Sequence, residues 1–231
     1  MYFCGMNKTT LLDYPGHVAA TVFTGGCNMR CPFCQNRGLV LEPGSQPVIP
    51  EQEVLDFLEK RKGILEGVCI TGGEPTLQAQ LGAFIRRVRE LGYLVKLDTN
   101  GYRPEVLRQL LEQGQLDYVA MDIKASRERY GIACGLRDVE VSLIEESVNL
   151  LKNCRIPYEF RTTVVKGIHS PEEFTSIGQW LQGCSAYYLQ SYRDSEQVMR
   201  LGFAAYEPGE LEEIRVRAAR YVPRTLLRGI D

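Results

Sequence analysis

The chain has 231 residues, with 27 basic and 29 acidic side chains and a formal charge of −2 at pH 7. This length suffices for one sizeable hydrophobic core or two small ones. No basic tract stands out, so we expect no nucleic-acid partner. The first residues, MYFCGMNKTTLLDYPGH, contain no apolar run long enough for a signal peptide or a membrane anchor. We therefore expect a cytoplasmic protein without membrane contact.

Segments typical of strands alternate with segments typical of helices along the chain. The first predicted strand is Val18 to Phe23, a short apolar run that ends at two glycines. The later predicted strands are Gly67 to Thr71, Leu94 to Leu97, Tyr118 to Ile123, Tyr158 to Val165 and Ala186 to Gln190. Apolar residues at helical spacing predict the helices between and after them, which are Glu51 to Lys62, Leu77 to Leu91, Pro104 to Gly114, Ser142 to Leu151, Pro171 to Leu181 and Pro208 to Tyr221.

A repeated strand-then-helix order favours parallel strands joined by right-handed crossovers. About six such units are predicted here, which is fewer than the eight of a closed barrel. The predicted fold class is therefore α/β, a partial (β/α)6 TIM-like open barrel of parallel strands. We expect a single domain over residues 1–231, with a core at about 16–195 and a C-terminal helix at about 208–221.

Polar clusters fall at the C-terminal ends of the predicted strands. Three cysteines follow the first strand, GGEP follows the second and DTNG follows the third. Asp122 and Lys124 end the fourth strand, Arg161 lies late in the fifth and Gln190 ends the sixth. In parallel α/β folds these strand ends share one face, where ligands bind. We therefore expect these side chains to converge on one site.

Eight cysteines in a reducing compartment favour metal binding or catalysis over disulfides for any clustered set. Five of them are scattered, and we interpret them as small buried hydrophobes: Cys4, Cys69, Cys134, Cys154 and Cys184. The other three, Cys27, Cys31 and Cys34, form a C-x3-C-x2-C array.

Thiolates suit zinc, copper and iron–sulfur clusters, but a structural zinc site needs four closed ligands. His17 is an unsuitable fourth ligand, because it precedes the first strand and lies at its opposite end. A catalytic zinc with a bound water and a [4Fe–4S] cluster with one iron open to a small molecule both remain compatible with three cysteines.

The C-x3-C-x2-C array after a first strand, with Phe33 just before its last cysteine, resembles the radical S-adenosylmethionine superfamily. The segments GGEP, DTNG, MDIK and KTTLLDYPG resemble a narrower group, the glycyl-radical-enzyme activating proteins. The closest group is the anaerobic ribonucleoside-triphosphate reductase activating proteins. The resemblance covers roughly residues 5–195.

This resemblance implies that Cys27, Cys31 and Cys34 are the metal ligands and catalytic centre, holding one [4Fe–4S] cluster. S-adenosylmethionine would chelate the open iron through its amino and carboxylate groups. One electron, from a flavodoxin-like or ferredoxin-like donor, would then cleave it to methionine and a 5′-deoxyadenosyl radical. The implied partner is a glycyl-radical enzyme, which loses a hydrogen atom from the Cα of one glycine.

The strand-end motifs are the predicted contacts to S-adenosylmethionine. In the family, the GGEP motif, here Gly72, Gly73 and Glu74, binds the amino group, although alone it could be an ordinary turn. Asp98, with its neighbour Thr99, is suited to the ribose hydroxyls. Phe33 is a candidate for the adenine, and Asn36 matches the family pattern after the last cysteine. Many activases have histidine at the position of Gln35, so this chain departs there.

Two further contacts remain open between a binding role and a structural one. Asp122 and Lys124 point to one face and resemble the activase pair that holds the methionine end, or they form a simple salt bridge. Arg161 is a carboxylate or substrate clamp, or an interior ion-pair partner. A further hypothesis is a monovalent cation shared by Asp98 and Asp122, because two adjacent carboxylates repel each other unless compensated.

Two alternatives compete with an activating enzyme. One is a radical enzyme that acts on a small metabolite, such as a 7-carboxy-7-deazaguanine synthase, which is similar in size. The other is a structural zinc or electron-transfer iron–sulfur protein. A structural zinc or electron-transfer protein would have no use for the convergence of GGEP, DTNG and the Asp–x–Lys pair. Analysis of the bound metal and sulfide distinguishes a zinc protein from one with a [4Fe–4S] cluster.

Overall fold

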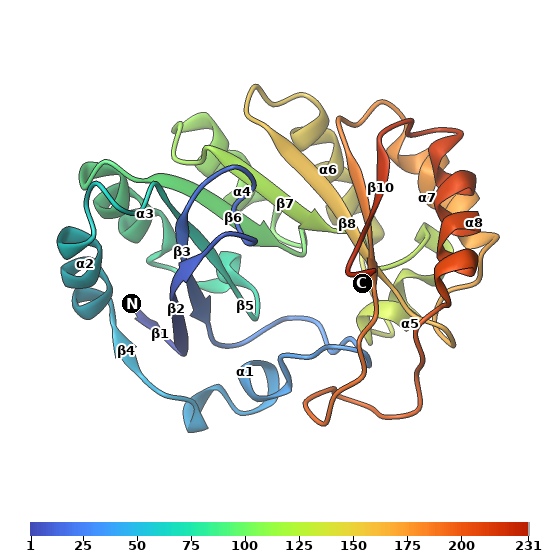
Figure 1. Ribbon diagram of the computed structural model, residues 1–231, viewed down its shortest axis with the longest axis horizontal. Helices are drawn as coiled ribbons and strands as arrows, with labels where there is room; N and C mark the ends of the chain where they lie inside the picture. The colour runs from blue at the N-terminus through green and yellow to red at the C-terminus, as the bar shows by residue number, and fades with distance from the viewer. Residues whose placement is uncertain (231) are drawn as a thin grey trace.

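A computed structural model describes residues 1–230, and its centre is an eight-stranded curved sheet in the order β10-β9-β8-β7-β6-β5-β3-β2 (Figure 1). Seven neighbouring strands run parallel. They are β3 (Ala19–Thr24), β5 (Gly67–Gly72), β6 (Leu94–Thr99), β7 (Tyr118–Asp122), β8 (Tyr158–Val164), β9 (Tyr187–Ser191) and β10 (Thr225–Arg228). The edge strand β2 (Gly5–Thr10) pairs antiparallel with β3. The sheet therefore has two edges, β2 and β10, and does not close on itself within these residues.

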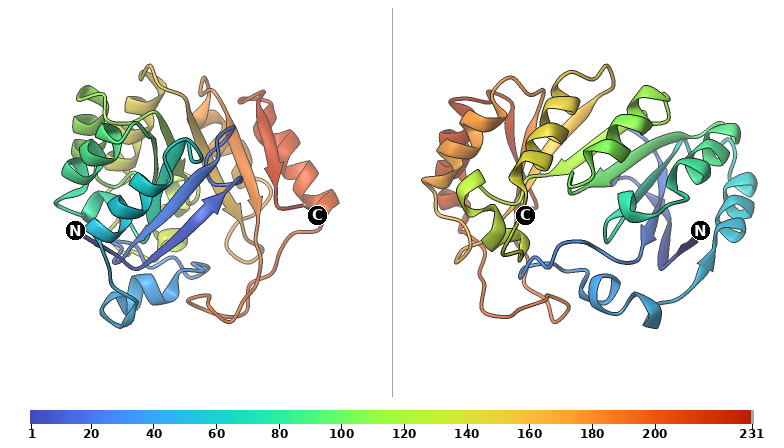
Figure 2. Two further views of the ribbon diagram at one scale, coloured as in Figure 1. Left: turned by 60° about the vertical axis from the view of Figure 1, so that its left-hand side comes forward. Right: turned by 180° about the vertical axis from the view of Figure 1, so that it is seen from behind.

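Helices cover the outer face of this sheet, as Figures 1 and 2 show from three sides. The main ones are α2 (Glu51–Lys60), α3 (Leu81–Glu90), α4 (Pro104–Glu112), α6 (Val141–Lys152), α7 (Glu173–Leu181) and α8 (Pro208–Ala219). The fold also contains two short helices, α1 (Arg37–Leu41) and α5 (Tyr130–Cys134), and three 3₁₀ turns at Pro43–Ser45, Pro75–Leu77 and Arg127–Arg129. A small antiparallel pair of strands, β1 (Tyr2–Phe3) and β4 (Ile49–Pro50), completes it. Among residues 1–230, no helix is both long and apolar enough to cross a bilayer.

Local sequence explains the main helices. In α3, the apolar residues Leu81, Phe84, Ile85 and Val88 recur every three or four positions, and all four are buried against the sheet side. Pro104 opens α4 at a position where no backbone donor is needed. A capping box between Glu207 and Glu210 begins α8.

The predicted partial barrel is confirmed, and all six predicted strands are present with shifts of one or two residues at their ends. Two strands of the sheet, β2 and β10, were not predicted. The sequence of β2, GMNKTT, is half-exposed to exposed and shows no apolar alternation. The predicted C-terminal helix ends at Ala219, and the four-residue strand β10 follows it.

The loop between β2 and β3 closes the N-terminal end of the barrel. Tyr14 of the DYPG motif is 2 % exposed, and a Cβ added at Gly67 would lie 2.8 Å from its ring. Its ring also lies 6.0 Å from that of Tyr118. Asp13 accepts a 2.6 Å hydrogen bond from the hydroxyl of Thr21. The DYPG motif therefore has a structural role, because it fills the barrel at the end opposite to the cysteines.

Candidate active site

A cavity of about 420 Å³ opens at the C-terminal ends of the parallel strands. Every residue predicted as a metal ligand or a cofactor contact lines it: Cys27, Cys31, Phe33, Cys34, Asn36, Gly72, Gly73, Glu74, Asp98, Thr99, Asp122, Lys124 and Arg161. The remaining wall comes from Met29, Gln35, Val40, Thr71, Asn100, Thr163, Gln190, Ser191, Arg193, Arg228 and Gly229. The expected convergence of sequence-distant motifs is thus observed.

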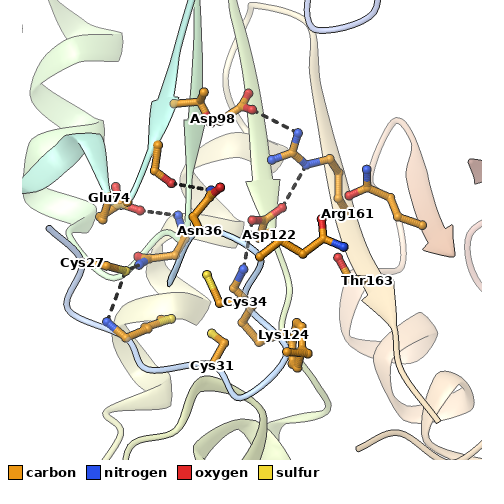
Figure 3. Close-up of a pocket in the computed structure, with 18 of the residues that line it drawn as sticks. Cys27, Cys31, Cys34, Asn36, Glu74, Asp98, Asp122, Lys124, Arg161 and Thr163 are labelled. Carbon is orange, nitrogen blue, oxygen red and sulfur yellow. Dashed lines mark hydrogen bonds and ion pairs between the residues drawn. The ribbon is translucent and has the colours of Figure 1, made fainter. Parts of the chain in front are cut away.

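The three cysteines lie on the loop between β3 and α1, and Figure 3 shows their sulfur atoms on one side of the cavity. Backbone hydrogen bonds fix this loop from several directions. Arg30 donates to the carbonyl of Cys134, while Met199 and Arg200 donate to the carbonyls of Cys34 and Pro32 at 3.0 and 2.9 Å. The segment after β9 therefore clamps the cysteine loop.

The cavity offers three thiols and, among the described residues, no fourth cysteine or histidine. Burial raises the pKa of the Cys31 thiol to about 12 and also raises that of Cys27. Both thiols are thus protonated in the metal-free protein, and metal binding would release their protons. No three His, Cys, Asp or Glu side chains in residues 1–230 are grouped closely enough to hold a single metal ion.

The other cysteines largely follow the prediction of buried hydrophobes. Cys4, Cys69 and Cys134 are buried, whereas Cys154 and Cys184 are half-buried. None of these five lines the cavity. His17 contacts Glu66 at the opposite end of the barrel, as expected.

The glycines of GGEP are required by the close approach of two loops. A Cβ at Gly73 would overlap the carbonyl of Gly26, and Gly72 has a φ of 120°. Gly73 and Glu74 donate backbone hydrogen bonds to Thr24 and Gly26 at 2.9 and 2.8 Å. The GGEP turn therefore packs directly on the start of the cysteine loop.

Glu74 joins the GGEP and DTNG turns. Its buried carboxylate accepts hydrogen bonds from the backbone and hydroxyl of Thr76, from the hydroxyl of Thr99 and from the backbone of Asn100. Burial raises the pKa of Glu74, and these donors oppose that rise. The side chain of Glu74 thus fixes the cavity wall, which leaves the backbone carbonyls of this turn as the groups able to accept from an ammonium.

Five charged side chains form a continuous row inside the barrel, in the order Lys96, Asp98, Arg161, Asp122 and Lys124 (Figure 3 labels the last four). Lys96 and Asp98 are in direct contact, and Arg161 reaches Asp98 at 3.2 Å and Asp122 at 2.9 Å. Lys124 closes the row at 3.0 Å from Asp122. We call this row the charge chain.

Each carboxylate oxygen of the charge chain has a cationic partner. Burial alone would raise the pKa of Asp122, but Arg161 and Lys124 lower it far below its usual range. Burial opposes the charge of Lys124, yet Asp122 raises its pKa. Arg161 therefore supplies the compensation between the two aspartates, and their mutual repulsion no longer argues for a bound monovalent cation.

Sequence reasoning assigned no role to His169, which lies beneath the site. Its Nδ1 accepts from the backbone N–H of Val165 at 3.1 Å, and its Nε2 donates to the carbonyl of Lys124 at 2.7 Å. Burial lowers the pKa of His169, so the neutral ring is favoured. His169 thus holds the backbone of Lys124. No motif marks this residue, and only its burial between two strand ends reveals it.

Two glutamines without an assigned role, Gln35 and Gln190, also line the cavity. Gln35 donates a 2.6 Å hydrogen bond to the carbonyl of Arg193, which links the cysteine loop to the segment after β9. Gln190, at the end of β9, lines the cavity beside Thr163.

Comparison with known proteins defines the class. Residues 21–181 match the model of the Radical SAM superfamily. Over 236 aligned residues, the chain is 31% identical to a Methanocaldococcus jannaschii protein named "Putative glycyl-radical enzyme activating enzyme", covering 98% of this chain and 95% of that protein. It is also 31% identical over 152 residues to a "Probable GTP 3',8-cyclase" of Thermococcus kodakarensis, but spans only 48% of that protein.

A solved structure, that of SuiB from Streptococcus suis bound to the precursor peptide SuiA, has the same fold with a TM-score of 0.71 at 13% identity. The match covers 90% of this chain and 48% of SuiB, so this chain spans about half the length of that protein.

The chain belongs to the radical SAM superfamily. It is an enzyme of this class, whose members use a [4Fe–4S] cluster and S-adenosylmethionine, and its full-length similarity lies with a protein named as a glycyl-radical enzyme activating enzyme.

Proposed function

We propose that this protein removes a hydrogen atom from the Cα of one glycine in a partner glycyl-radical enzyme, the anaerobic ribonucleoside-triphosphate reductase. The observation that carries the proposal is a cavity with three cysteine donors and no fourth cysteine or histidine within the described residues. The similarity to an activating enzyme over 98% of the chain supports the partner class.

Cys27, Cys31 and Cys34 would hold the [4Fe–4S] cluster, because they are the cavity's soft donors. The bound cluster with S-adenosylmethionine supplies a one-electron cleavage that yields the 5′-deoxyadenosyl radical. The chain's own residues bind and orient. Lys124 offers an ammonium to the carboxylate of the methionine end, and Asp122 and His169 hold that lysine in place.

Other cofactor contacts follow from groups that still have hydrogen-bonding capacity. The carbonyl of Gly73 would accept from the amino group, since the side chain of Glu74 is already engaged. Asp98 keeps a second lone pair on each oxygen for the ribose hydroxyls. Phe33 and Asn36 line the cavity beside the cysteines and complete the contacts. Arg161 would clamp a carboxylate only through the part of its guanidinium that the two aspartates leave open.

The same proposal sets the cellular context. Residues 1–231 would act as one catalytic domain in the cytoplasm, where the eight thiols stay reduced. A flavodoxin-like or ferredoxin-like protein would supply the electron.

An experiment with three samples tests the function. The cluster is reconstituted anaerobically, and S-adenosylmethionine and dithionite are added alone, with the purified reductase, or with a purine-like metabolite. We expect a glycyl-radical signal by electron paramagnetic resonance only with the reductase. Cleavage stimulated only by the metabolite would instead favour the alternative of a small-molecule radical enzyme. Zinc without sulfide in the purified protein would contradict both.

A further inference from the structure

The loop that carries the three cysteines also has a side outside the cavity. Two segments contact the loop there, α5 and residues 199–202 (Figure 1 shows α5 beside the loop). The backbone N–H of Arg30 donates to the carbonyl of Cys134 at 2.8 Å, and that of Arg200 donates to the carbonyl of Pro32 at 2.9 Å. None of these four residues lines the cavity. The loop and the two segments thus form a second surface around the cysteines.

This second surface is basic, although the whole chain carries a charge of −2. Three exposed arginines lie on it: Arg30 in the loop, Arg137 after α5, and Arg200. Within residues 1–230, none of the three forms an ion pair with a carboxylate. The stretches 28–32, 130–138 and 199–202 contain one acidic side chain, Asp138, so positive charge is in excess.

Arg30 connects this surface directly to a cysteine of the triad. Its Nη1 donates to the backbone carbonyls of Cys27 and Met29 at 2.6 and 2.8 Å. Gly135 packs tightly against it, because a Cβ added at Gly135 would lie 2.2 Å from the carbonyl oxygen of Arg30. A single exposed side chain therefore separates solvent from the backbone of Cys27 on this side.

Two aliphatic side chains accompany the arginines. Ile132 on α5 is 56% exposed, and Leu201 is 69% exposed. We call the five residues Arg30, Ile132, Arg137, Arg200 and Leu201 the arginine face. Its cations favour a partner with an acidic surface, and its aliphatic side chains favour an apolar group among the partner's acidic residues.

The position of the arginine face indicates what this partner supplies. The sulfur atoms of the cysteines lie on the cavity side, which S-adenosylmethionine and the substrate would occupy (Figure 3). An electron must then reach the cluster from the other side of the cysteine loop, where the arginine face lies. Interfaces between electron-transfer partners are small, below about 1,200 Å² in total, so a patch of a few side chains suffices.

We propose that the arginine face docks a small acidic flavoprotein, the electron donor of this enzyme. A flavin suits the face because the dimethylbenzene edge of its ring is apolar and can contact Ile132 and Leu201. One electron leaves the reduced flavin and enters the cluster, and no bond is formed or broken. This inference rests on the cluster of the proposed function and adds the class of donor and its docking site.

The double substitution Arg137→Glu with Arg200→Glu tests the inference, because it reverses two charges of the face and leaves Arg30 in place. Arg86→Glu with Arg220→Glu is the matched control, since these arginines are exposed on α3 and just after α8. The probe is a purified flavodoxin. Two quantities are measured without the reductase: the Kd between flavodoxin and the metal-free protein by calorimetry, and the rate at which reduced flavodoxin reduces the reconstituted cluster in anaerobic stopped flow. Light-driven reduction by deazariboflavin, a small uncharged donor, reports on the cluster itself.

We expect the double variant to raise the Kd and lower the bimolecular rate by at least about tenfold at low salt, because complementary charge accelerates association by about 10- to 1,000-fold. The difference from the wild type should shrink as potassium chloride is added, since salt screens exposed charges. Iron content and reduction by deazariboflavin should match the wild type.

Four results would overturn the arginine face as the docking site. They are an unchanged Kd and rate, an equal loss in the control variant, an equal loss with deazariboflavin, and a loss with a ferredoxin but not with flavodoxin. The first two remove the surface, the third shows damage to the cysteine loop, and the fourth removes the flavoprotein. Because no reductase is present, failure to form a glycyl radical on the reductase would refute the proposed function without altering these rates.

Discussion

Substitution of Arg161 by methionine tests the charge chain. The change removes two charge-assisted hydrogen bonds, at 2.9 Å to Asp122 and 3.2 Å to Asp98. Each such bond contributes about 1.5–3 kcal/mol. Lys96 and Lys124 still pair with the two aspartates, so we take the low end and expect a loss of about 3 kcal/mol. For a chain of this length, that loss lowers Tm by about 6–12 °C.

The assay is thermal unfolding of the metal-free protein under anaerobic conditions. Arg217→Met is the control, because this arginine forms a surface pair with Glu172 at 3.9 Å and should contribute less than about 1 kcal/mol. Potassium chloride and choline chloride are compared at equal ionic strength. With Arg161 removed, two aspartates face each other across the vacated position, so potassium should raise the Tm of this variant and leave that of the wild type unchanged.

Two results would refute this reasoning. A drop in Tm no larger than that of the control would show that Arg161 does not hold the aspartates together. Potassium-dependent stability or activity in the wild-type protein would show that the two carboxylates need a cation besides the guanidinium.

The remaining predictions concern the cysteines, His169 and the GGEP turn. Alanine at Cys27, Cys31 or Cys34 should abolish iron binding and 5′-deoxyadenosine formation. Cys69→Ala should retain both, as measured by iron analysis and by chromatography of 5′-deoxyadenosine. Loss of iron from Cys69→Ala would show that the division of the cysteines into cluster ligands and buried hydrophobes is wrong. Burial lowers the pKa of His169 in the folded protein, so its contribution to stability is present above its unfolded value of about 6.5 and is lost as pH falls below it. His169→Gln should therefore lose up to about 1.4 kcal/mol of the stability difference that the wild type shows between pH 7.5 and 5.5 in urea unfolding. Gly73→Ala should reduce reconstituted iron severely, because its Cβ overlaps the carbonyl of Gly26, whereas Gly44→Ala meets open space and should match the wild type.

Much of the architecture could be predicted from the sequence, because each buried parallel strand is a short apolar run and each main helix carries a periodic apolar face. The strands β2 and β10 lacked that signal: one is polar and exposed, and the other is four residues long at an edge of the sheet. Because β10 was not predicted, part of the site was not predicted either: Arg228, the last residue of β10, and the adjacent Gly229 line the cavity.

The candidate site was predicted as a set of residues, and part of its internal pairing was among the alternatives. The Asp122–Lys124 salt bridge and the ion-pair role of Arg161 are both present, but the two partners of Arg161 were not predicted. Strand ends in a parallel sheet meet on one face, which brought the motifs together. That Arg161 bridges two aspartates, and that His169 holds Lys124, depends on side-chain directions across three strands. Such pairings leave no pattern in sequence spacing.

The most direct test of the central claim is the fate of one hydrogen atom. The reductase is prepared with glycine deuterated at Cα, and the reconstituted enzyme is supplied with S-adenosylmethionine and one electron equivalent. Mass spectrometry of the released 5′-deoxyadenosine should show a single deuterium, gained in step with the glycyl-radical signal. Unlabelled 5′-deoxyadenosine formed alongside that signal, or label gained only from a small metabolite, would contradict abstraction from a protein glycine at this site.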